Sequence, residues 1–254
     1  KEAGCSSVCM SIETANSDIR TTILKRKIQT NEEIIKAFDR FNRYGINVYT
    51  NSILGLPTAT IEDELDTLDL YVRSKPKCGY FTICVPYPGT DMHSYCVEHD
   101  LIGNDPDMIS RSSGDYSLLN SFSKKEKRVQ KNIALLGPVI VAFPFFKKLA
   151  TKYLIYMPNN IFFFLIHYVV KNYLFKKYIV PTKFRLVDYF HIGLAALKSD
   201  VIMYMKKRKV KSPSIKAKNP STKIESPSIK IESLSTKENF EDLAHKEHKD
   251  FILK

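Results

Sequence analysis

Residues 46–54 read INVYTNSIL and are followed by the turn residues GLP, and this stretch decides the class of fold. Val48 and Leu54 fall on one side of an extended chain, whereas Tyr49 and Asn51 fall on the other. A period of two residues is typical of a β-strand with one apolar face and one polar face. The sequence therefore predicts a strand over 46–54 with an apolar face for the helices and a second face that carries polar groups.

Two further strands are predicted at 7–13 (SVCMSIE) and at 79–86 (GYFTICVP). Both repeat the alternation, because apolar side chains oppose a second face that carries Glu13 in one strand and Thr82 in the other. A shared polar face suits a barrel or half-barrel that holds a polar ligand. An antiparallel sheet with one wet face would show the same alternation and stays an alternative.

Helices are predicted between these strands. Thr30 and Glu33 form a capping-box pattern that opens one helix, and Gly45 ends it. Thr60 opens a second helix, which Pro76 ends. The resulting order β-α-β-α-β favours parallel strands with right-handed crossovers. We therefore expect an α/β fold with a partial (β/α) barrel over residues 1–95.

After residue 90 the sequence no longer predicts alternating strands and helices. Residues 92–123 are expected to be a polar, loop-rich connection, and residues 96–205 as a whole are expected to form a connection followed by basic aromatic helices. Helix breaks are expected at Pro138, Pro144, Pro158 and Pro181. Residues 206–254 are polar and lysine-rich and repeat SPSIK with a period of 14, which predicts a disordered tail.

The charge distribution and the number of cysteines indicate the partners and the compartment to expect for this protein. The net charge of +12 divides into −5 over residues 1–123, +11 over 124–200 and +6 over 201–254, so the two halves are expected to have different partners. Five cysteines, an odd number, favour reduced thiols and a cytoplasmic protein. The opening KEAG is typical of the last turn of a helix, which predicts that a first half of the fold is missing.

Four motifs carry a resemblance to a known family: GCSSVCMSIET (4–14), ILKR (23–26), NSILGLP (51–57) and PYPGT (86–90). In this order they resemble the later half of a radical S-adenosylmethionine (SAM) enzyme core, in the branch with an N-terminal cobalamin-binding domain. The resemblance implies a (β/α)₆ partial barrel whose fourth, fifth and sixth strands are the three predicted here. It also implies SAM as cofactor.

The family's cluster motif, Cys-x₃-Cys-x₂-Cys, is not reproduced. Cys5 and Cys9 have the first spacing, but Ile12 stands where the third thiolate is required. Two thiolates do not hold a [4Fe–4S] cluster, so we interpret both as packed residues and assign no metal ligands. The cluster, and cobalamin with it, are expected only in a complete protein. The missing N-terminal half or an upstream gene product would supply them.

The resemblance places SAM contacts on four segments. Glu13 would lie near the ribose or the amino acid end, and Lys25 or Arg26 would hold the carboxylate, with Arg26 preferred for its planar fork. Asn51 would be an inward polar residue. The adenine would meet the backbone of Val85, Pro86 and Tyr87. Ordinary structural roles remain open for these residues, and no catalytic residue is assigned.

The resemblance implies that a complete enzyme generates a 5′-deoxyadenosyl radical for methyl transfer or other C–H chemistry. The alternative is a non-catalytic remnant that acts as a membrane-surface or partner-binding module. Residues 161–170 (IFFFLIHYVV) are too short to span a bilayer, but lysines flank them. They either contact an anionic membrane peripherally or pack on the barrel mouth. Nucleic acid is not an expected partner.

Overall fold

The computed structural model describes residues 1–26, 30–103, 116–180 and 194. The chain divides into two compact units, residues 1–188 and 189–254, and the fold given below is that of the first unit. The helix break expected at Pro181 and the tail expected over 206–254 lie outside the described residues.

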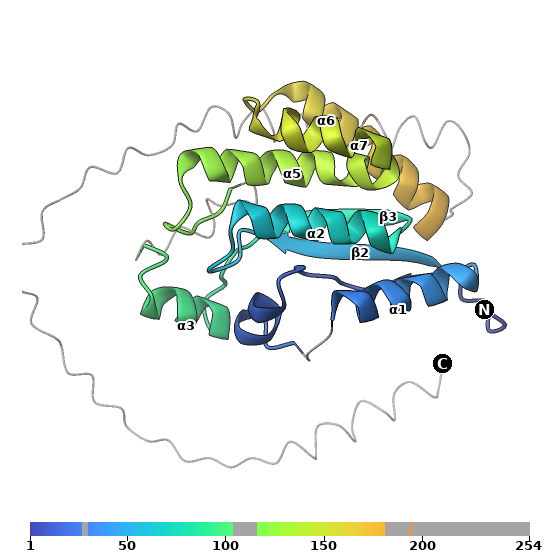
Figure 1. The fold of residues 1–254 in the computed structure, drawn as a ribbon, viewed down its shortest axis with the longest axis horizontal. Coiled ribbons are helices and arrows are strands. Elements are labelled where there is room, and N and C mark those ends of the chain that lie inside the picture. The colour runs from blue at the N-terminus through green and yellow to red at the C-terminus, as the bar shows by residue number, and fades with distance from the viewer. Residues whose placement is uncertain (27–29, 104–115, 181–193, 195–254) are drawn as a thin grey trace, which may run out of the picture. The chain divides into compact units, whose positions relative to one another are not determined.

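Three strands form one sheet in the order β1-β2-β3 (Figure 1). Their bounds are β1 Ser7–Cys9, β2 Asn47–Leu54 and β3 Cys78–Ile83. Both strand pairs are parallel, with Ser7 opposite Asn47 and Tyr49 opposite Cys78. The prediction of a parallel sheet is confirmed, and the antiparallel alternative is wrong.

Two capped helices connect the strands. They are α1 Asn31–Arg43 and α2 Ile61–Ser74. The capping box of Thr30 with Glu33 is present as expected, and Thr60 forms a second one with Asp63. Left-handed backbone ends both segments, at Gly45 (φ 64°) and at Lys75 (φ 51°), the residue before Pro76. Local sequence therefore determines where these helices begin and end.

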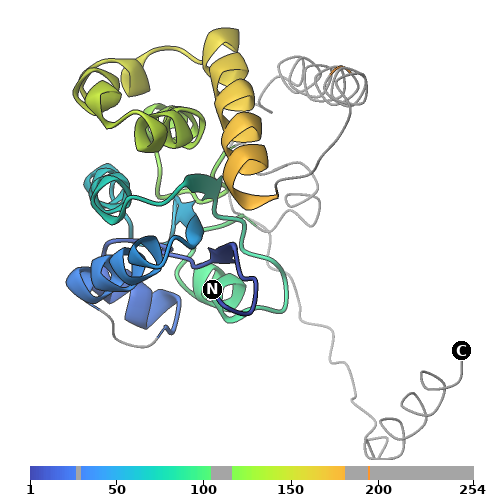
Figure 2. The same cartoon turned by 90° about the vertical axis from the view of Figure 1, so that its right-hand side faces the viewer.

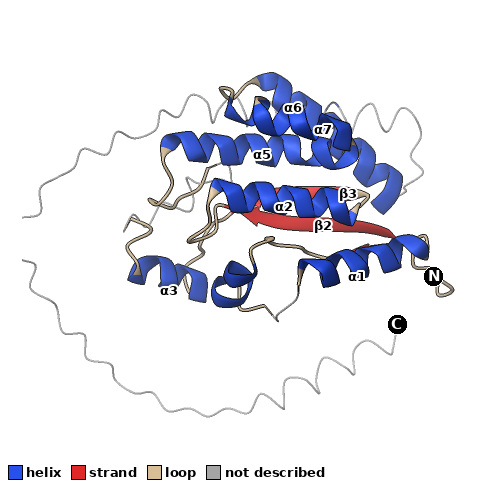
Figure 3. Ribbon diagram, viewed as in Figure 1, coloured by secondary structure: helices blue, strands red, loops and turns tan. Residues whose placement is uncertain are grey.

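The main core lies between one face of the sheet and the helices. Figure 3 shows these helices beside the strands. Val48 and Leu54 of β2 are fully buried there with Phe38 of α1 and Leu68 of α2. The third covering helix is α5 Lys124–Ala142, which packs on β3. Residues 124–142 therefore complete the core of the sheet.

Pro138 does not break α5, contrary to expectation. A proline inside a helix costs about 3 kcal/mol because it removes a hydrogen bond and crowds the preceding turn. Val129, Ile133 and Ile140 of the same helix are buried in the core, and each such side chain contributes about 1.5–3 kcal/mol. Burial of the apolar face thus outweighs the local cost.

The remaining described elements are short or follow α5. They are η1 Ile19–Ile23, α3 Asp91–Glu98, η2 Pro144–Phe146, α6 Lys147–Lys152, η3 Leu154–Tyr156, α7 Ile161–Leu174 and η4 Phe175–Ile179. The breaks expected at Pro144 and Pro158 are confirmed. α3 corrects the expected loop, because Thr90 caps it and accepts a hydrogen bond from His93 N at 3.2 Å. No helix among the described residues is long and apolar enough to cross a membrane.

The second face of the sheet is partly covered by η4. Tyr49 and Tyr80 meet edge to face at 5.0 Å, and Phe175 lies 6.0 Å from the first ring and 6.3 Å from the second. Asn47 Nδ2 donates to Tyr178 O at 2.8 Å. Figure 2 shows α2 and the end of α7 on opposite sides of the strands. Near the start of the strands, the polar face is therefore packed against helix.

The cysteines divide by depth. Cys78, Cys84 and Cys96 are buried free thiols. Cys9 is exposed and Cys5 is half-buried, so the expectation that this pair is packed is wrong for Cys9. Cys9 lies on β1, which stands at the edge of the sheet and, among the described residues, pairs with β2 alone.

Candidate functional site

The backbone at Glu13 positions the candidate site. Ile12 N and Glu13 N both donate to Asn51 O, at 3.1 and 3.2 Å, and Ile53 N donates to Glu13 O at 3.0 Å. Two residues thus oppose one residue of β2, which is a bulge. Glu13 adopts a left-handed φ of 64°, which is uncommon for a residue other than glycine. The bulge interrupts the regular strand expected over 7–13 and re-aims the glutamate.

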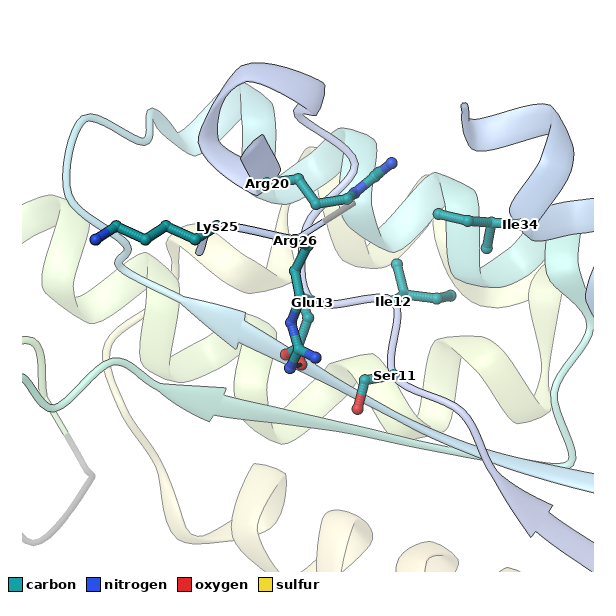
Figure 4. A pocket seen from close by; sticks show the side chains of 7 residues that line it. All are labelled: Ser11, Ile12, Glu13, Arg20, Lys25, Arg26 and Ile34. Carbon is teal, nitrogen blue, oxygen red and sulfur yellow. Dashed lines mark hydrogen bonds and ion pairs between the residues drawn. The ribbon is translucent and has the colours of Figure 1, made fainter. Parts of the chain in front are cut away.

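Glu13 forms an ion pair with Arg26 (Figure 4). Arg26 Nη2 lies 2.9 Å from Glu13 Oε1, and the glutamate side chain is 12% exposed against 62% for the arginine. Within residues 1–26, 30–103 and 116–180, Glu13 Oε2 has no hydrogen-bond partner, and Arg26 uses one of its nitrogens. The pair therefore keeps an acceptor and several donors for a ligand.

Lys25, the alternative carboxylate ligand, points away from this pair (Figure 4). Its Nζ lies 2.5 Å from Asp91 Oδ2 at the start of α3, and both side chains are largely exposed. The lysine lowers the pKa of the Asp91 carboxyl by hydrogen bonding and charge. Because Lys25 already has this partner, the geometry favours Arg26 as the cation available at Glu13.

A cavity of about 490 Å³ opens beside the ion pair, lined by Ser11, Ile12, Glu13, Arg20, Lys25, Arg26 and Ile34. Arg20 is 3% exposed, and its guanidinium donates to Thr14 O at 2.7 Å and to Asn31 Oδ1 at 2.7 Å. Burial lowers the pKa of Arg20. Sequence analysis missed this residue, because nothing distinguishes it locally from the polar residues around it. Its bonds hold the turn after Glu13 against α1.

Asn51 lies next to Glu13 through the backbone pairing of the bulge. Its side-chain Oδ1 is buried and has no hydrogen-bond partner among the described residues. A buried acceptor left without a donor costs about 1–3 kcal/mol. Asn51 does not line the 490 Å³ cavity. The oxygen is therefore a buried acceptor for which the described residues supply no donor.

Val85, Pro86 and Tyr87 follow β3, which ends at Ile83 and not at residue 86 as expected. Cys84 N donates to Leu54 O at 2.7 Å, and Pro86 then has no N–H to continue the ladder. Tyr87 is exposed, and its carbonyl accepts from Thr90 N and Oγ1. The structure brings Glu13 and Arg26 together at the cavity and pairs the backbone of Asn51 with that of Glu13. Neither Asn51 nor residues 85–87 line the cavity.

A buried carboxyl lies beneath the GLP turn. Glu64 Oε1 accepts from Gly55 N at 2.7 Å and from Gln130 Nε2 at 3.0 Å. Burial raises the pKa of Glu64 to about 8. Gly55 has φ 67°, and a Cβ there would lie 3.3 Å from Gln130 Oε1, so glycine suits the position. The sequence offered no signal for Glu64, because its partner Gln130 is 66 residues away.

Metal-ligating groups do not gather in the parts of the chain that the structure describes. No three His, Cys, Asp or Glu side chains lie together there. Cys5 and Cys9 supply two thiols at most. The described residues therefore do not fit a [4Fe–4S] cluster.

Comparisons with known proteins show which family the first part of the chain resembles. The Radical SAM superfamily model matches residues 1–71, which hold β1, α1, β2 and most of α2. The uncharacterized methyltransferase PH0819 of Pyrococcus horikoshii is 30% identical over 102 residues, which is 40% of this chain and 22% of that protein. The chain thus spans about a fifth of the length of this relative. Residues 1–71 are accordingly a Radical SAM superfamily domain.

Proposed function

We propose that residues 1–95 bind S-adenosylmethionine at the carboxyl ends of the strands, as the later half of a radical SAM core. The single observation that carries this proposal is the bulge. It pairs the backbone of Glu13, which forms the ion pair with Arg26, with the backbone of Asn51, whose side-chain Oδ1 is orphaned. The Radical SAM match over 1–71 supports the choice of ligand.

Each residue of this group suits one part of the cofactor. The planar guanidinium of Arg26 matches the carboxylate of the methionine moiety, and the free oxygen of Glu13 matches its ammonium or a ribose hydroxyl. Asn51 Oδ1 would accept a hydrogen bond from a hydroxyl. The backbone of residues 85–87 is proposed to contact the adenine. The bound cofactor would then extend from the cavity at Glu13 to the end of β3.

The reaction class proposed is methyl transfer, because the relative of Pyrococcus horikoshii is named a methyltransferase. Bound S-adenosylmethionine supplies an activated methyl group, and the residues above would bind and orient it. The described residues provide no cluster site, so we assign them no part in forming a radical. We propose that an N-terminal half or an upstream gene product provides the cluster, and cobalamin where it is used.

Isothermal titration with S-adenosylmethionine tests the proposal, on the 254-residue chain and on its complex with a co-expressed N-terminal half. Replacing Asn51 with Leu removes the acceptor and should weaken binding by about 1–3 kcal/mol. Arg26→Gln should weaken binding as well, and Arg26→Lys should recover part of the loss. Asn172→Leu, on the exposed side of α7, is the matched control and should bind normally.

Two results would contradict the proposal. Unchanged affinity in both Asn51→Leu and Arg26→Gln would remove these residues from the pocket. Absence of binding to the chain and to the complex would favour the alternative, a non-catalytic module. The DNA upstream of the coding sequence then distinguishes a split enzyme from a non-catalytic module. An open reading frame that encodes Cys-x₃-Cys-x₂-Cys is expected only for a split enzyme.

A further inference from the structure

The helix α7 is apolar on nearly all sides. Phe163 and Leu174 are buried, and the outward side carries exposed apolar residues at spacings of four, three and four: Phe162, Ile166, Val169 and Tyr173. Lys171 is the one charged residue in its 14 positions. A helix that is apolar all round is normally covered on every side. The exposed stripe of α7 is therefore a surface that none of the described residues covers.

The turn that follows α5 extends this surface. Phe145 is 85% exposed and Phe162 is 70% exposed, which is unusual for large aromatic side chains. An apolar groove of about 270 Å³ lies beside them, and its lining includes Phe143, Phe146 and Ile166. We call the exposed stripe of α7 together with this groove the aromatic face.

The surroundings of the aromatic face are strongly basic. No Asp or Glu occurs from residue 127 to residue 187. Lys148 and Lys152 are one turn apart on α6 and are exposed beside Leu149 and Tyr153, which are exposed as well. A second copy of this chain would bring like charges together, whereas an anionic partner would neutralise them. The charge pattern therefore argues against self-association.

We propose that the aromatic face docks on an anionic phospholipid membrane. Phe145 and Phe162 would enter the boundary between headgroups and acyl chains, and Lys148 and Lys152 would lie at the level of the lipid phosphates. With 14 residues, α7 is too short to span the bilayer and would lie in its surface. This proposal is independent of the cofactor pocket, because none of its residues lines the cavity at Glu13.

The test is co-sedimentation of the 254-residue chain with vesicles of phosphatidylcholine alone or of equimolar phosphatidylcholine and phosphatidylserine. We expect binding to the anionic vesicles only. Phe145→Ser and Phe162→Ser should each weaken it about tenfold, because burying such a side chain is worth roughly 1.5–3 kcal/mol. Lys148→Gln and Lys152→Gln should each weaken it about fivefold, since each lysine near the surface contributes about 1 kcal/mol.

Matched controls lie on α1 and at its end, away from the aromatic face. Tyr44→Ser replaces an exposed aromatic residue, and the pair Lys36→Gln and Arg40→Gln removes two exposed charges at the same spacing as on α6. These variants should bind anionic vesicles as the parent chain does. All variants keep the basic residues 206–254, so binding through that segment alone would leave every variant equal.

Three outcomes would overturn the proposal. They are equal binding to both kinds of vesicle, binding that Phe145→Ser does not weaken, and a lipid-free dimer that this substitution dissolves. The last would show that a second copy covers the aromatic face. Should Phe162→Ser lower the thermal stability, Phe145→Ser decides by itself, because a side chain 85% exposed contributes little to the fold.

Discussion

Glu13 shows how one backbone angle builds a site. A regular strand would place it on the same face as Cys9. The left-handed φ of 64° and the two N–H groups that share Asn51 O interrupt that alternation. Such a conformation costs about 1–3 kcal/mol, and strained residues of this kind cluster at functional sites. The strain at Glu13 therefore agrees with a binding role for this residue.

Glu64 gives a prediction at the same scale. The pKa of its carboxyl rises from 4.5 to about 8 through burial, so between these values the native state holds a proton that the unfolded state releases. The free energy of unfolding must then fall as the pH rises from about 4.5 towards 8. Glu64→Gln keeps an acceptor for Gly55 N and cannot ionise. Urea denaturation across this pH range should show a much smaller fall in the variant.

The control for Glu64 is Glu62→Gln, an exposed carboxylate on the same helix. It should retain the pH dependence of the parent chain. A parent whose stability does not change over this range would show that Glu64 is ionised in the native state. Glu64 Oε2 and Gln130 Oε1 are both buried without a donor in the described part of the chain, and a proton on Glu64 supplies one.

Among the elements, α5 depends on a close approach to β3. A Cβ at Gly137 would lie 2.5 Å from the ring of Phe81, so glycine allows the helix to pack on the strand. The ring of Tyr71, on α2, lies 4.4 Å from that of Phe81 and limits its movement. Gly137 and Pro138 are both poor helix formers, yet they stand in the middle of a 19-residue helix. At Gly137 and Pro138, packing of the helix against the sheet therefore outweighs the low helix propensity of the two residues.

We expect Gly137→Ala to lower the free energy of unfolding by about 1–3 kcal/mol, because the added methyl group overpacks the contact with Phe81. Phe81→Leu destabilises by itself, since it shortens a core side chain. In the double variant the cost of the alanine should largely disappear, which a double-mutant cycle measures by chemical denaturation. Strict additivity of the two substitutions would contradict the contact.

At the scale of the whole molecule, η4 returns to the start of the sheet from far along the chain. Ser7 Oγ donates to Ile179 O at 3.2 Å across 172 residues. Phe175 packs against Tyr49 and Tyr80 on the face of the sheet that also carries Asn51. The helical region and the three strands therefore form one unit, although they differ in charge and composition.

Thiol reactivity tests this closure. Cys78 is buried, and burial raises the pKa of its thiol to about 11, so it should react slowly with an aromatic disulfide reagent. Cys9 is exposed and should react quickly. Phe175→Ala removes a ring from the cover and should make one more thiol reactive. Adding Cys78→Ser should abolish that gain, and a gain that persists would show that η4 does not protect Cys78.

Local sequence determined the framework of this protein. Capping boxes at Thr30 and Thr60, a stop at Gly45 and the alternation along 46–54 are interactions within a few residues, so helices α1 and α2 and strand β2 could be predicted from them. The order of strands and helices was enough to predict a parallel sheet. That Glu13 and Arg26 belong to one site could also be predicted, because only 13 residues separate them and both lie in motifs that resemble the family.

Tertiary structure decided the rest, since each remaining feature depends on partners distant in the chain. The bulge at Glu13 forms against Asn51, Glu64 meets Gln130, and Pro138 stays helical because α5 packs on β3. Free energies from such long-range burial exceed local propensities, and no short stretch of residues records them. The segments of the chain provide the strands and helices, and their packing places the charged groups where a ligand could bind.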